Sequence, residues 1–380
     1  MRFDTRLIHA RQPADALTGA VNPPIYLSST FRQRAPNRNQ GYVYSRSGNP
    51  TRTVLEGILA DLESGARGLA FASGLGALTT VLEAFPSGSR IVSVDDVYGG
   101  TWRLFEHHRT QFGIRVDYVD LTDAAATDEA LATPADLVWI ETPTNPLLKV
   151  VDLKRVVRRA HAAGGLVGVD NTFATPALQR PIEYGADLVL HSTTKYLGGH
   201  SDIIGGALVL ARPRDGERFA WLQNAVGAVP SPVDAFLVVR GLHTLGLRMR
   251  AHGAAAAAVA AALDGHRAVR TVHYPGLSSH PQHALARRQM SGYGGMVSVE
   301  LAGGGRAARA FLRRLKIFTL AESLGGVESL VDHPASMTHA SVPRAEREAH
   351  GVTDGLVRLS CGIEDPADLV DDVTAALRDP

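Results

Sequence analysis

Short strand-like runs alternate with helix-like segments between residues 50 and 210, and this alternation restricts the folds that the chain can adopt. The runs are rich in β-branched and other apolar residues, and they cover residues 90–94, 114–119, 136–141, 165–170, 187–192 and 206–211. Residues 51–64 and 152–163 each place apolar side chains on one helical face, and Asp152 is a favourable N-cap for the second helix. Strands that alternate with helices predict an α/β fold with a mostly parallel sheet and helices on both faces.

The chain divides into three predicted parts. Residues 1–46 contain seven arginines against two aspartates, a charge of +5, and they hold no long periodic segment. A basic, irregular segment of this length needs a surface to lie against, so we expect an N-terminal arm that packs on a neighbouring subunit; a disordered tail is the alternative. Residues 47–246 form the predicted large domain. An alanine-rich helix at 252–263 lies near the start of a smaller α+β domain, residues 247–380, which ends in an amphipathic helix near 366–377.

The charge balance and the cysteine count exclude several classes of protein. The net charge of +1 gives no reason to expect binding to nucleic acid or to a membrane surface. Cys361 is the single cysteine, so the chain can form neither an intramolecular disulfide nor a CxxC metal site. No apolar run approaches the roughly 18 residues of a membrane span, and residues 1–12 lack the apolar core of a signal peptide. We therefore expect a cytoplasmic protein.

Polar side chains gather where the predicted strands end, which is where an open parallel sheet binds ligands. They are Tyr98 after the first strand, Asn145 after the third, Asp170, Asn171 and Thr172 at the end of the fourth, and Ser192, Thr194 and Lys195 at the end of the fifth. We expect these four clusters to converge at one edge of the sheet. A fifth element, at Gly74 and Leu75, begins a predicted helix with small residues, and a helix N-terminus of this kind can bind a phosphate.

These side chains together favour pyridoxal phosphate over a purely structural role. The helix N-terminus alone is a weak signal, because a capped structural helix looks the same. Lys195 adds an amine that can attach to a carbonyl carbon, and Asp170 adds a carboxylate that can keep a pyridine nitrogen protonated. Tyr98 adds an aromatic face and a phenol for proton transfer. The hydroxyls of Ser192 and Thr194 add donors for the phosphate.

Other classes of site explain fewer of these residues. Ser192 and Lys195 also fit the S-x-x-K pair of a serine hydrolase, but that pair lies on a helix and needs a K-T-G companion, which the sequence lacks. No G-x-G-x-x-G follows the first strand, which disfavours a nicotinamide dehydrogenase. The paired histidines at 107–108 and those at 280 and 283 have no acidic or cysteine cluster beside them, so we expect no metal site.

Nine motifs carry a resemblance to a known family. They are YSRSGNPT (44–51), FASGL (71–75), DDVYGGT (95–101), WIETPTNP (139–146), VDNTF (169–173), HSTTKYLGGHSD (191–202), RGLHTL (240–245), AESLGGVESL (321–330) and RLSCGIED (358–365). With these motifs the chain resembles, from about residue 20 to 380, the Cys/Met-metabolism family of pyridoxal-phosphate-dependent enzymes. The resemblance implies the type I pyridoxal-phosphate fold, with a mostly parallel sheet of the seven-stranded type and a smaller C-terminal domain. It also implies a homotetramer of tight dimers that share active sites.

The resemblance implies a role for each candidate residue. Lys195 would hold the cofactor covalently and act as the base, Asp170 would pair with the pyridine nitrogen, and Tyr98 would stack on the ring. The implied phosphate site and its surroundings are Gly74, Leu75, Ser192, Thr194 and Thr172, with Tyr44 and Arg46 reaching in from the neighbouring subunit. The implied substrate site consists of Asn145, Ser323 and Arg358, which would hold the α-carboxylate, together with Glu322 and Tyr44.

Two positions narrow the choice within the family. Gly100 stands where methionine γ-lyases usually carry a cysteine, and Glu322 stands where those enzymes are usually apolar. A glutamate at this position is typical of enzymes that handle cystathionine. The chain looks most like the cystathionine γ-lyases, which implies α,γ-elimination of L-cystathionine to L-cysteine, 2-oxobutanoate and ammonia. The alternative is γ-replacement of O-acyl-L-homoserine by cysteine, as in the cystathionine γ-synthases.

Overall fold

A mixed sheet forms the centre of the larger part of the chain. The computed structural model describes residues 1–12 and 14–378, and within them seven strands form this sheet in the order β1-β7-β6-β5-β4-β2-β3. The strands are β1 (Arg67–Phe71), β2 (Arg90–Val94), β3 (Arg115–Val119), β4 (Leu137–Glu141), β5 (Leu166–Asp170), β6 (Leu188–Ser192) and β7 (Gly206–Leu210). β7 runs antiparallel to its neighbours β1 and β6, and the other pairings are parallel. The predicted α/β class with a mostly parallel sheet is confirmed.

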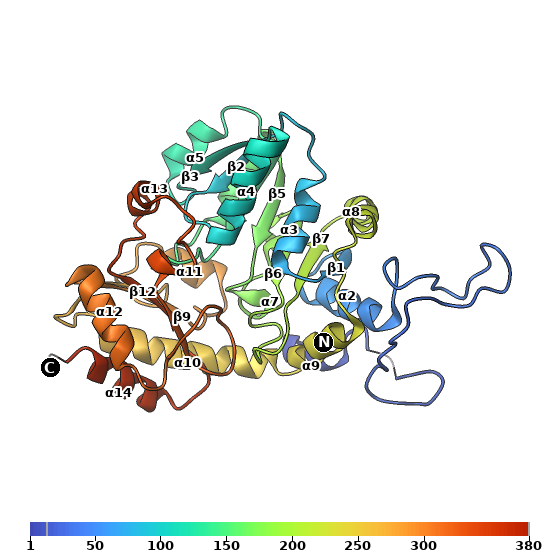
Figure 1. The fold of residues 1–380 in the computed structure, drawn as a ribbon. Coiled ribbons are helices and arrows are strands. Elements are labelled where there is room, and N and C mark those ends of the chain that lie inside the picture. The colour runs from blue at the N-terminus through green and yellow to red at the C-terminus, as the bar shows by residue number, and fades with distance from the viewer. Residues whose placement is uncertain (13, 379–380) are drawn as a thin grey trace.

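Helices cover both faces of this sheet, as the alternation of segments predicts (Figure 1). They are α1 (Phe3–His9), α2 (Pro50–Leu62), α3 (Gly74–Leu82), α4 (Gly99–Phe112), α5 (Ala124–Ala130), α6 (Leu153–Ala162), α7 (Thr175–Leu178), the 3₁₀ turn η1 (Pro181–Tyr184), α8 (Pro213–Val226), α9 (Pro232–Leu242) and α10 (Leu245–Leu263). On β6, Leu188 and Leu190 join an apolar cluster that includes α3, whereas Val189 joins a second cluster that includes α2. The predicted cap of α6 is present, because the Asp152 side chain accepts a hydrogen bond from the Arg155 N–H.

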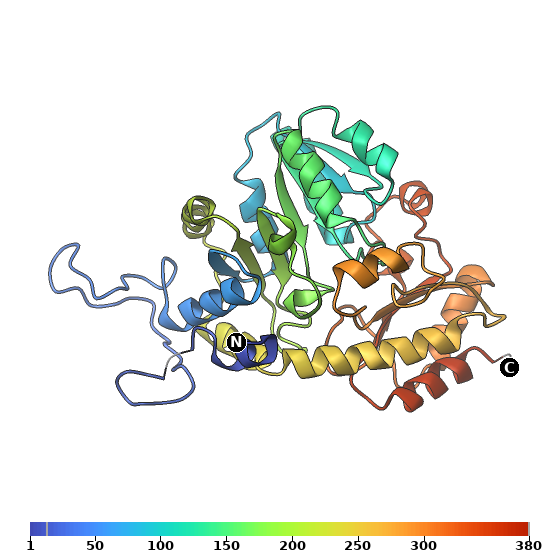
Figure 2. The same ribbon diagram turned by 180° about the vertical axis from the view of Figure 1, so that it is seen from behind.

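A second, smaller sheet lies in the C-terminal part. In the described portion of that part, five strands pair in the order β10-β11-β12-β9-β8. The elements are β8 (Val269–His273), α11 (His283–Gln289), β9 (Met296–Leu301), α12 (Gly304–Arg314), β10 (Thr319–Leu320), β11 (Leu330–Asp332), the 3₁₀ turn η2 (Pro334–Ser336), α13 (Arg344–Ala349), β12 (Leu356–Ser360) and α14 (Pro366–Ala376). The alanine-rich helix is longer than predicted, since α10 begins at Leu245, and it runs along both parts of the molecule (Figure 2).

The N-terminal segment combines a packed helix with an extended arm. Residues 3–9 form α1, a short helix that the sequence pattern does not reveal, and Arg6 pairs with Asp61 of α2 at 2.8 Å. Beyond it, the chain extends away from the body of the molecule as a long loop (Figure 1). Leu17, Val21 and Leu27 on this loop are 90%, 85% and 73% exposed. Such apolar exposure on an extended loop is typical of a segment that packs on another chain.

Candidate active site

A cavity of about 580 Å³ opens at the carboxyl ends of the central strands. It is lined by residues of both parts of the chain, including twelve of the predicted site residues: Gly74, Leu75, Tyr98, Asn145, Asp170, Thr172, Ser192, Thr194, Lys195, Glu322, Ser323 and Arg358. These residues are separated by up to 284 positions in the sequence, from Gly74 to Arg358, and the fold brings them to one place. The predicted convergence of the strand-end clusters is therefore observed.

Lys195 follows the end of β6 and reaches into the cavity. Its Nζ donates a hydrogen bond to Ser323 Oγ at 2.8 Å. Burial, followed by the nearby Arg358 guanidinium, lowers the pKa of Lys195 to about 8. A substantial fraction of this amine is consequently neutral near physiological pH, and a neutral amine is the nucleophilic form.

Two carboxyl groups stand side by side at the ends of β4 and β5. Glu141 and Asp170 are paired in register on these adjacent parallel strands, and both line the cavity. Burial raises the pKa of Asp170, and burial followed by the charge of Asp170 raises the pKa of Glu141 well above its usual value. The Thr172 N–H donates to Asp170 Oδ1 at 3.0 Å and so orients that carboxylate. Sequence reasoning missed Glu141, because a glutamate inside an apolar run gives no signal of its strand neighbour.

The N-terminus of α3 lies against the end of β6. Ser73 caps this helix by accepting from the Gly76 N–H at 2.9 Å. A Cβ atom on Gly74 would lie 3.2 Å from Ser192 Cβ, so glycine keeps the space between the helix terminus and Ser192 open. The Thr194 hydroxyl accepts from the Gly205 N–H at 3.0 Å and lines the same cavity. A helix N-terminus, adjacent hydroxyls, a lysine amine and a buried carboxylate are the groups that a pyridoxal phosphate requires, and the residues present fit it.

Tyr98 precedes α4 and places its ring at the cavity wall. Its backbone N–H donates to Glu141 Oε2 at 3.0 Å, and burial raises the pKa of its phenol. The ring packs over Gly100, where an added Cβ atom would lie 2.4 Å from the Tyr98 Cε1 atom. The glycine noted in the sequence therefore makes room for the tyrosine ring.

Arg358 enters the cavity from β12 and is 2% exposed. Its Nη1 donates to Asn145 Oδ1 at 2.7 Å, and its Nη2 forms an ion pair with the buried Asp332. Asp332 was not recognised from the sequence, since it lies 26 residues upstream on the neighbouring strand β11. These two partners orient the guanidinium toward the space beside Lys195, as a carboxylate-binding arginine requires.

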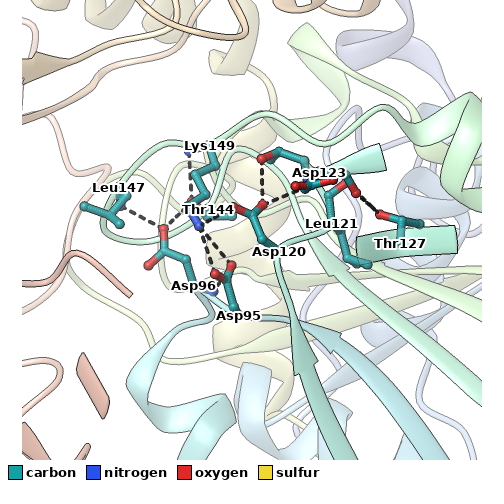
Figure 3. A network of polar contacts seen from close by, with 10 residues as sticks. Asp95, Asp96, Asp120, Leu121, Asp123, Thr127, Thr144, Leu147 and Lys149 are labelled. Carbon is teal, nitrogen blue, oxygen red and sulfur yellow. Dashed lines mark hydrogen bonds and ion pairs between the residues drawn. The ribbon is translucent and has the colours of Figure 1, made fainter. Parts of the chain in front are cut away.

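A polar network joins the segment after β2 to the loop after β4 (Figure 3). Asp96 is buried, accepts from the Thr144 hydroxyl and the Leu147 N–H, and has a pKa raised by burial to about 7. Lys149 Nζ contacts Asp95 at 3.0 Å and Asp120 at 3.2 Å. The network thus joins the segment before Tyr98 to the loop around Asn145.

Two predicted site residues lie outside the cavity of this chain. Tyr44 and Arg46 belong to the extended arm, and among the described residues they are not part of the lining. Tyr44 is 45% exposed, and the Arg46 guanidinium carbon lies 5.5 Å from its ring centroid. Their contribution to a neighbouring subunit's site stays a prediction.

The described residues were searched for helices that could cross a membrane and for groups of side chains that could hold a metal ion. No helix in them is long and apolar enough to cross a membrane. No group of three or more histidine, cysteine, aspartate or glutamate side chains in residues 1–12 and 14–378 could hold a metal ion. Cys361 is buried, and burial raises the pKa of its thiol.

Comparison with known proteins places the chain among pyridoxal-phosphate-dependent enzymes. Residues 4–378 match the family model described as Cys/Met metabolism PLP-dependent enzyme. The chain is 52% identical over 377 residues to cystathionine β-lyase of Coxiella burnetii, covering 99% of this chain and 97% of that protein. It is 49% identical to cystathionine γ-lyase of Bacillus subtilis, with 99% of both chains covered. The structure of cystathionine γ-synthase from Xanthomonas oryzae pv. oryzae in complex with cystathionine superposes with a TM-score of 0.97, at 50% identity, covering 99% of this chain and 98% of that one.

Proposed function

The chain belongs to the Cys/Met metabolism family of pyridoxal-phosphate-dependent enzymes, and we propose that it catalyses the α,γ-elimination of L-cystathionine. With one water molecule, this reaction gives L-cysteine, 2-oxobutanoate and ammonia. The observation that carries the proposal is the Glu322 carboxylate, which lines the same cavity as Lys195 and Arg358. Cystathionine has a carboxylate at each end and a second ammonium group, so it offers an anion for Arg358 and a distal cation for Glu322.

The cofactor-binding residues of the proposal are those that line the inner part of the cavity. When bound, pyridoxal phosphate supplies an electron sink for the negative charge that develops at the substrate's Cα. Lys195 would hold it covalently, Asp170 would pair with its ring nitrogen, and Tyr98 would cover its ring. Gly74, Leu75, Ser192 and Thr194 would bind its phosphate, with Thr172 orienting Asp170.

Lys195 and Tyr98 would move the protons. Arg358 and Asn145 fix the α-carboxylate of the substrate, which turns the Cα–H bond toward Lys195 Nζ. Because the pKa of Lys195 is lowered to about 8, its neutral amine can take the Cα proton. After that proton has been passed on and the amine is neutral again, the same group can take a proton from Cβ. The raised pKa of Tyr98 keeps its phenol protonated, so this group can donate a proton to the departing sulfur.

A γ-synthase is the second candidate, and a specific likeness favours it. The structure of the Xanthomonas γ-synthase in complex with cystathionine matches this chain with a TM-score of 0.97. Elimination and replacement share the same early proton transfers, and they differ in what attacks after the γ-substituent has left. Cystathionine would be the substrate of the first reaction and the product of the second.

Product analysis with two substrate samples, L-cystathionine alone and O-acetyl-L-homoserine with cysteine, tests the proposal. We expect 2-oxobutanoate from L-cystathionine alone, and none after the Lys195→Ala substitution, which also removes the covalent link to the cofactor. Pyruvate with homocysteine in place of 2-oxobutanoate would reveal β-elimination and overturn the assignment. Formation of cystathionine from O-acetyl-L-homoserine and cysteine, without elimination of cystathionine, would establish the γ-synthase instead.

A substitution of Glu322 tests whether its carboxylate binds the distal ammonium of cystathionine, and a substrate without this ammonium serves as the control. Glu322→Gln removes the negative charge and keeps the size of the side chain. We expect it to raise KM for cystathionine by about tenfold, the effect of one lost charge-assisted hydrogen bond. It should leave KM for O-acetyl-L-homoserine within about twofold, because that substrate has no distal ammonium. Equal effects on both substrates would remove Glu322 from substrate recognition.

A further inference from the structure

A buried carboxylate, Glu63, lies behind the sheet at the end of α2. Its side chain is 1% exposed. Its Oε1 atom accepts from His191 Nε2 at 2.6 Å and from Asn171 Nδ2 at 2.8 Å. Because a carboxylate oxygen is an acceptor, the His191 tautomer in this contact carries its proton on Nε2. None of these three side chains belongs to the lining of the active-site cavity.

The two donors sit directly beside residues that do line the cavity. His191 precedes Ser192 on β6, and Asn171 follows Asp170 at the end of β5. Successive side chains of a strand point to opposite faces of the sheet. His191 and Asn171 accordingly lie on the rear face with α2, whereas Asp170 and Ser192 lie on the cavity face. The carboxylate of Glu63 thus joins the ends of two adjacent strands from behind.

The hydrogen bonds that begin at Glu63 continue through the buried amide side chains of Gln179 and Gln289. Gln179 Nε2 donates to Asn171 Oδ1 and to the Thr142 carbonyl, each at 3.1 Å. Gln289 Nε2, on α11, donates to Gln179 Oε1 at 2.9 Å. All of these side chains are less than 9% exposed. The ends of β4, β5 and β6 are therefore tied together on the rear face, and the tie reaches the smaller part of the chain.

We propose that Glu63 is a positioning residue that fixes the separation of Asp170 and Ser192. By holding Asn171 and His191 on the rear face, it sets how far apart the ring-binding carboxylate and the phosphate-binding hydroxyl stand on the front face. This inference rests on the proposed roles of Asp170 and Ser192 as holders of opposite ends of the cofactor. The Oε1 atom of Glu63 meets both donors, and these hydrogen bonds offset part of the cost of burying the carboxylate.

The test measures cofactor affinity separately from stability of the fold. Full-length Glu63→Ala, Glu63→Gln and Asp372→Ala variants are stripped of cofactor and titrated with pyridoxal phosphate, and their unfolding midpoints in urea are recorded. Asp372 is the matched control, since it is also buried and accepts from the N–H groups of Lys316, Ile317 and Phe318, and none of these residues lines the cavity. The Asp372→Ala substitution should lower the unfolding midpoint in urea and leave the Kd for pyridoxal phosphate unchanged.

We expect Glu63→Ala to weaken cofactor binding by at least about tenfold, the effect of one lost buried hydrogen bond. Glu63→Gln keeps the accepting oxygen and should restore Kd to within about threefold of the natural protein. If Glu63→Ala does not fold, Glu63→Asp takes its place in the test. The shorter aspartate side chain cannot reach both donors, so the Glu63→Asp protein should bind the cofactor more weakly than the Glu63→Gln protein. A Kd of Glu63→Ala that stays within about twofold of the natural value, or a control that weakens binding equally, would refute the proposal.

The Asp170→Asn variant shows whether a negative result refutes only the positioning role of Glu63 or the proposed cofactor site as well. If Asp170→Asn weakens cofactor binding and Glu63→Ala does not, Glu63 has no positioning role and the proposed cofactor site is retained. If Asp170→Asn changes neither cofactor binding nor the visible absorbance of the bound cofactor, the proposed role of Asp170 is wrong. The positioning role of Glu63, which depends on it, is then wrong as well.

Discussion

Labelling of the cofactor-free protein with a small amine reagent, such as cyanate, tests the environment of Lys195 directly. The chain has four lysines, and Lys154 on α6 is exposed, so it reports the intrinsic reactivity of the reagent in the same sample. Labelling of Lys195 is followed by peptide mass spectrometry as a function of pH. Because burial slows access at every pH equally, the informative quantity is the midpoint of the pH curve rather than the absolute rate.

The expected size of the effect follows from the lowered pKa. With a pKa of about 8, roughly a tenth of Lys195 is neutral at pH 7. An ordinary lysine, with a pKa of about 10.4, is neutral to less than about 0.1% at the same pH. The neutral fraction therefore rises by about two orders of magnitude. Labelling of Lys195 should be half-maximal near pH 8.

Two variants test the cause of the shift as well as its size. Arg358 lowers the pKa of Lys195 and Glu322 raises it. Arg358→Leu should therefore move the labelling midpoint of Lys195 to higher pH, and Glu322→Gln should move it to lower pH. A midpoint above pH 10 in the natural protein, or shifts of the opposite sign in the variants, would refute the electrostatic argument.

Two further substitutions have defined outcomes. The folded-state pKa of Asp96 is raised to about 7, so its protonated form stabilises the fold below about pH 4, and that contribution is lost as pH rises toward 7. Asp96→Asn does not titrate, so it should remove this loss. About 3 kcal/mol of the loss falls between pH 5 and pH 8, at 1.36 kcal/mol per pKa unit over the two units from pH 5 to the pKa. Urea unfolding at these two pH values measures it, and an unchanged pH dependence would contradict the assignment. Gly100→Ala places a Cβ atom against the Tyr98 ring, so we expect at least about tenfold lower turnover and altered circular dichroism of the bound cofactor; normal values of both would show that the ring position is not critical.

The parts of the fold that depend on local periodicity were predictable from the sequence. Residues 90–94 form β2 as predicted, and Asp152 caps α6, because alternation and capping are encoded within a few neighbouring residues. β1 was missed. It begins with Arg67-Gly68 and owes its place to pairing with the distant β7. The two-residue strand β10 is likewise defined by its neighbour rather than by its own sequence.

In the candidate site, too, residues marked by the sequence around them could be predicted, and residues whose roles depend on distant partners could not. Asp170 and Lys195 could be identified because the first ends a recognisable strand and the second follows one, and an open parallel sheet binds ligands there. Asp332 and Glu63 could not, since their roles come from partners 26 and 128 residues away in the sequence. Neither carboxylate lies in a motif of its own, and an acidic residue without a visible partner most often faces solvent.

The extended N-terminal arm is the part of the chain that we expect to pack on a neighbouring subunit. Leu17, Val21 and Leu27 are largely exposed in the single chain, although apolar side chains on a loop are stabilised by packing. Tyr44 and Arg46 lie on the same arm and not at the cavity of their own chain. We propose that the protein is a homotetramer of tight dimers in which these two residues complete the neighbouring site.

Mixing two inactive variants tests whether the sites are shared. Lys195→Ala removes the amine of its own site, and Arg46→Ala removes a group that would act in the neighbouring site. In a mixed dimer, one site then has both defects and the other has neither. Random exchange of equal amounts should restore about a quarter of the natural turnover, because half of the dimers are mixed and each has one intact site. Mixtures that stay inactive after subunit exchange is verified would show that Arg46 serves its own chain.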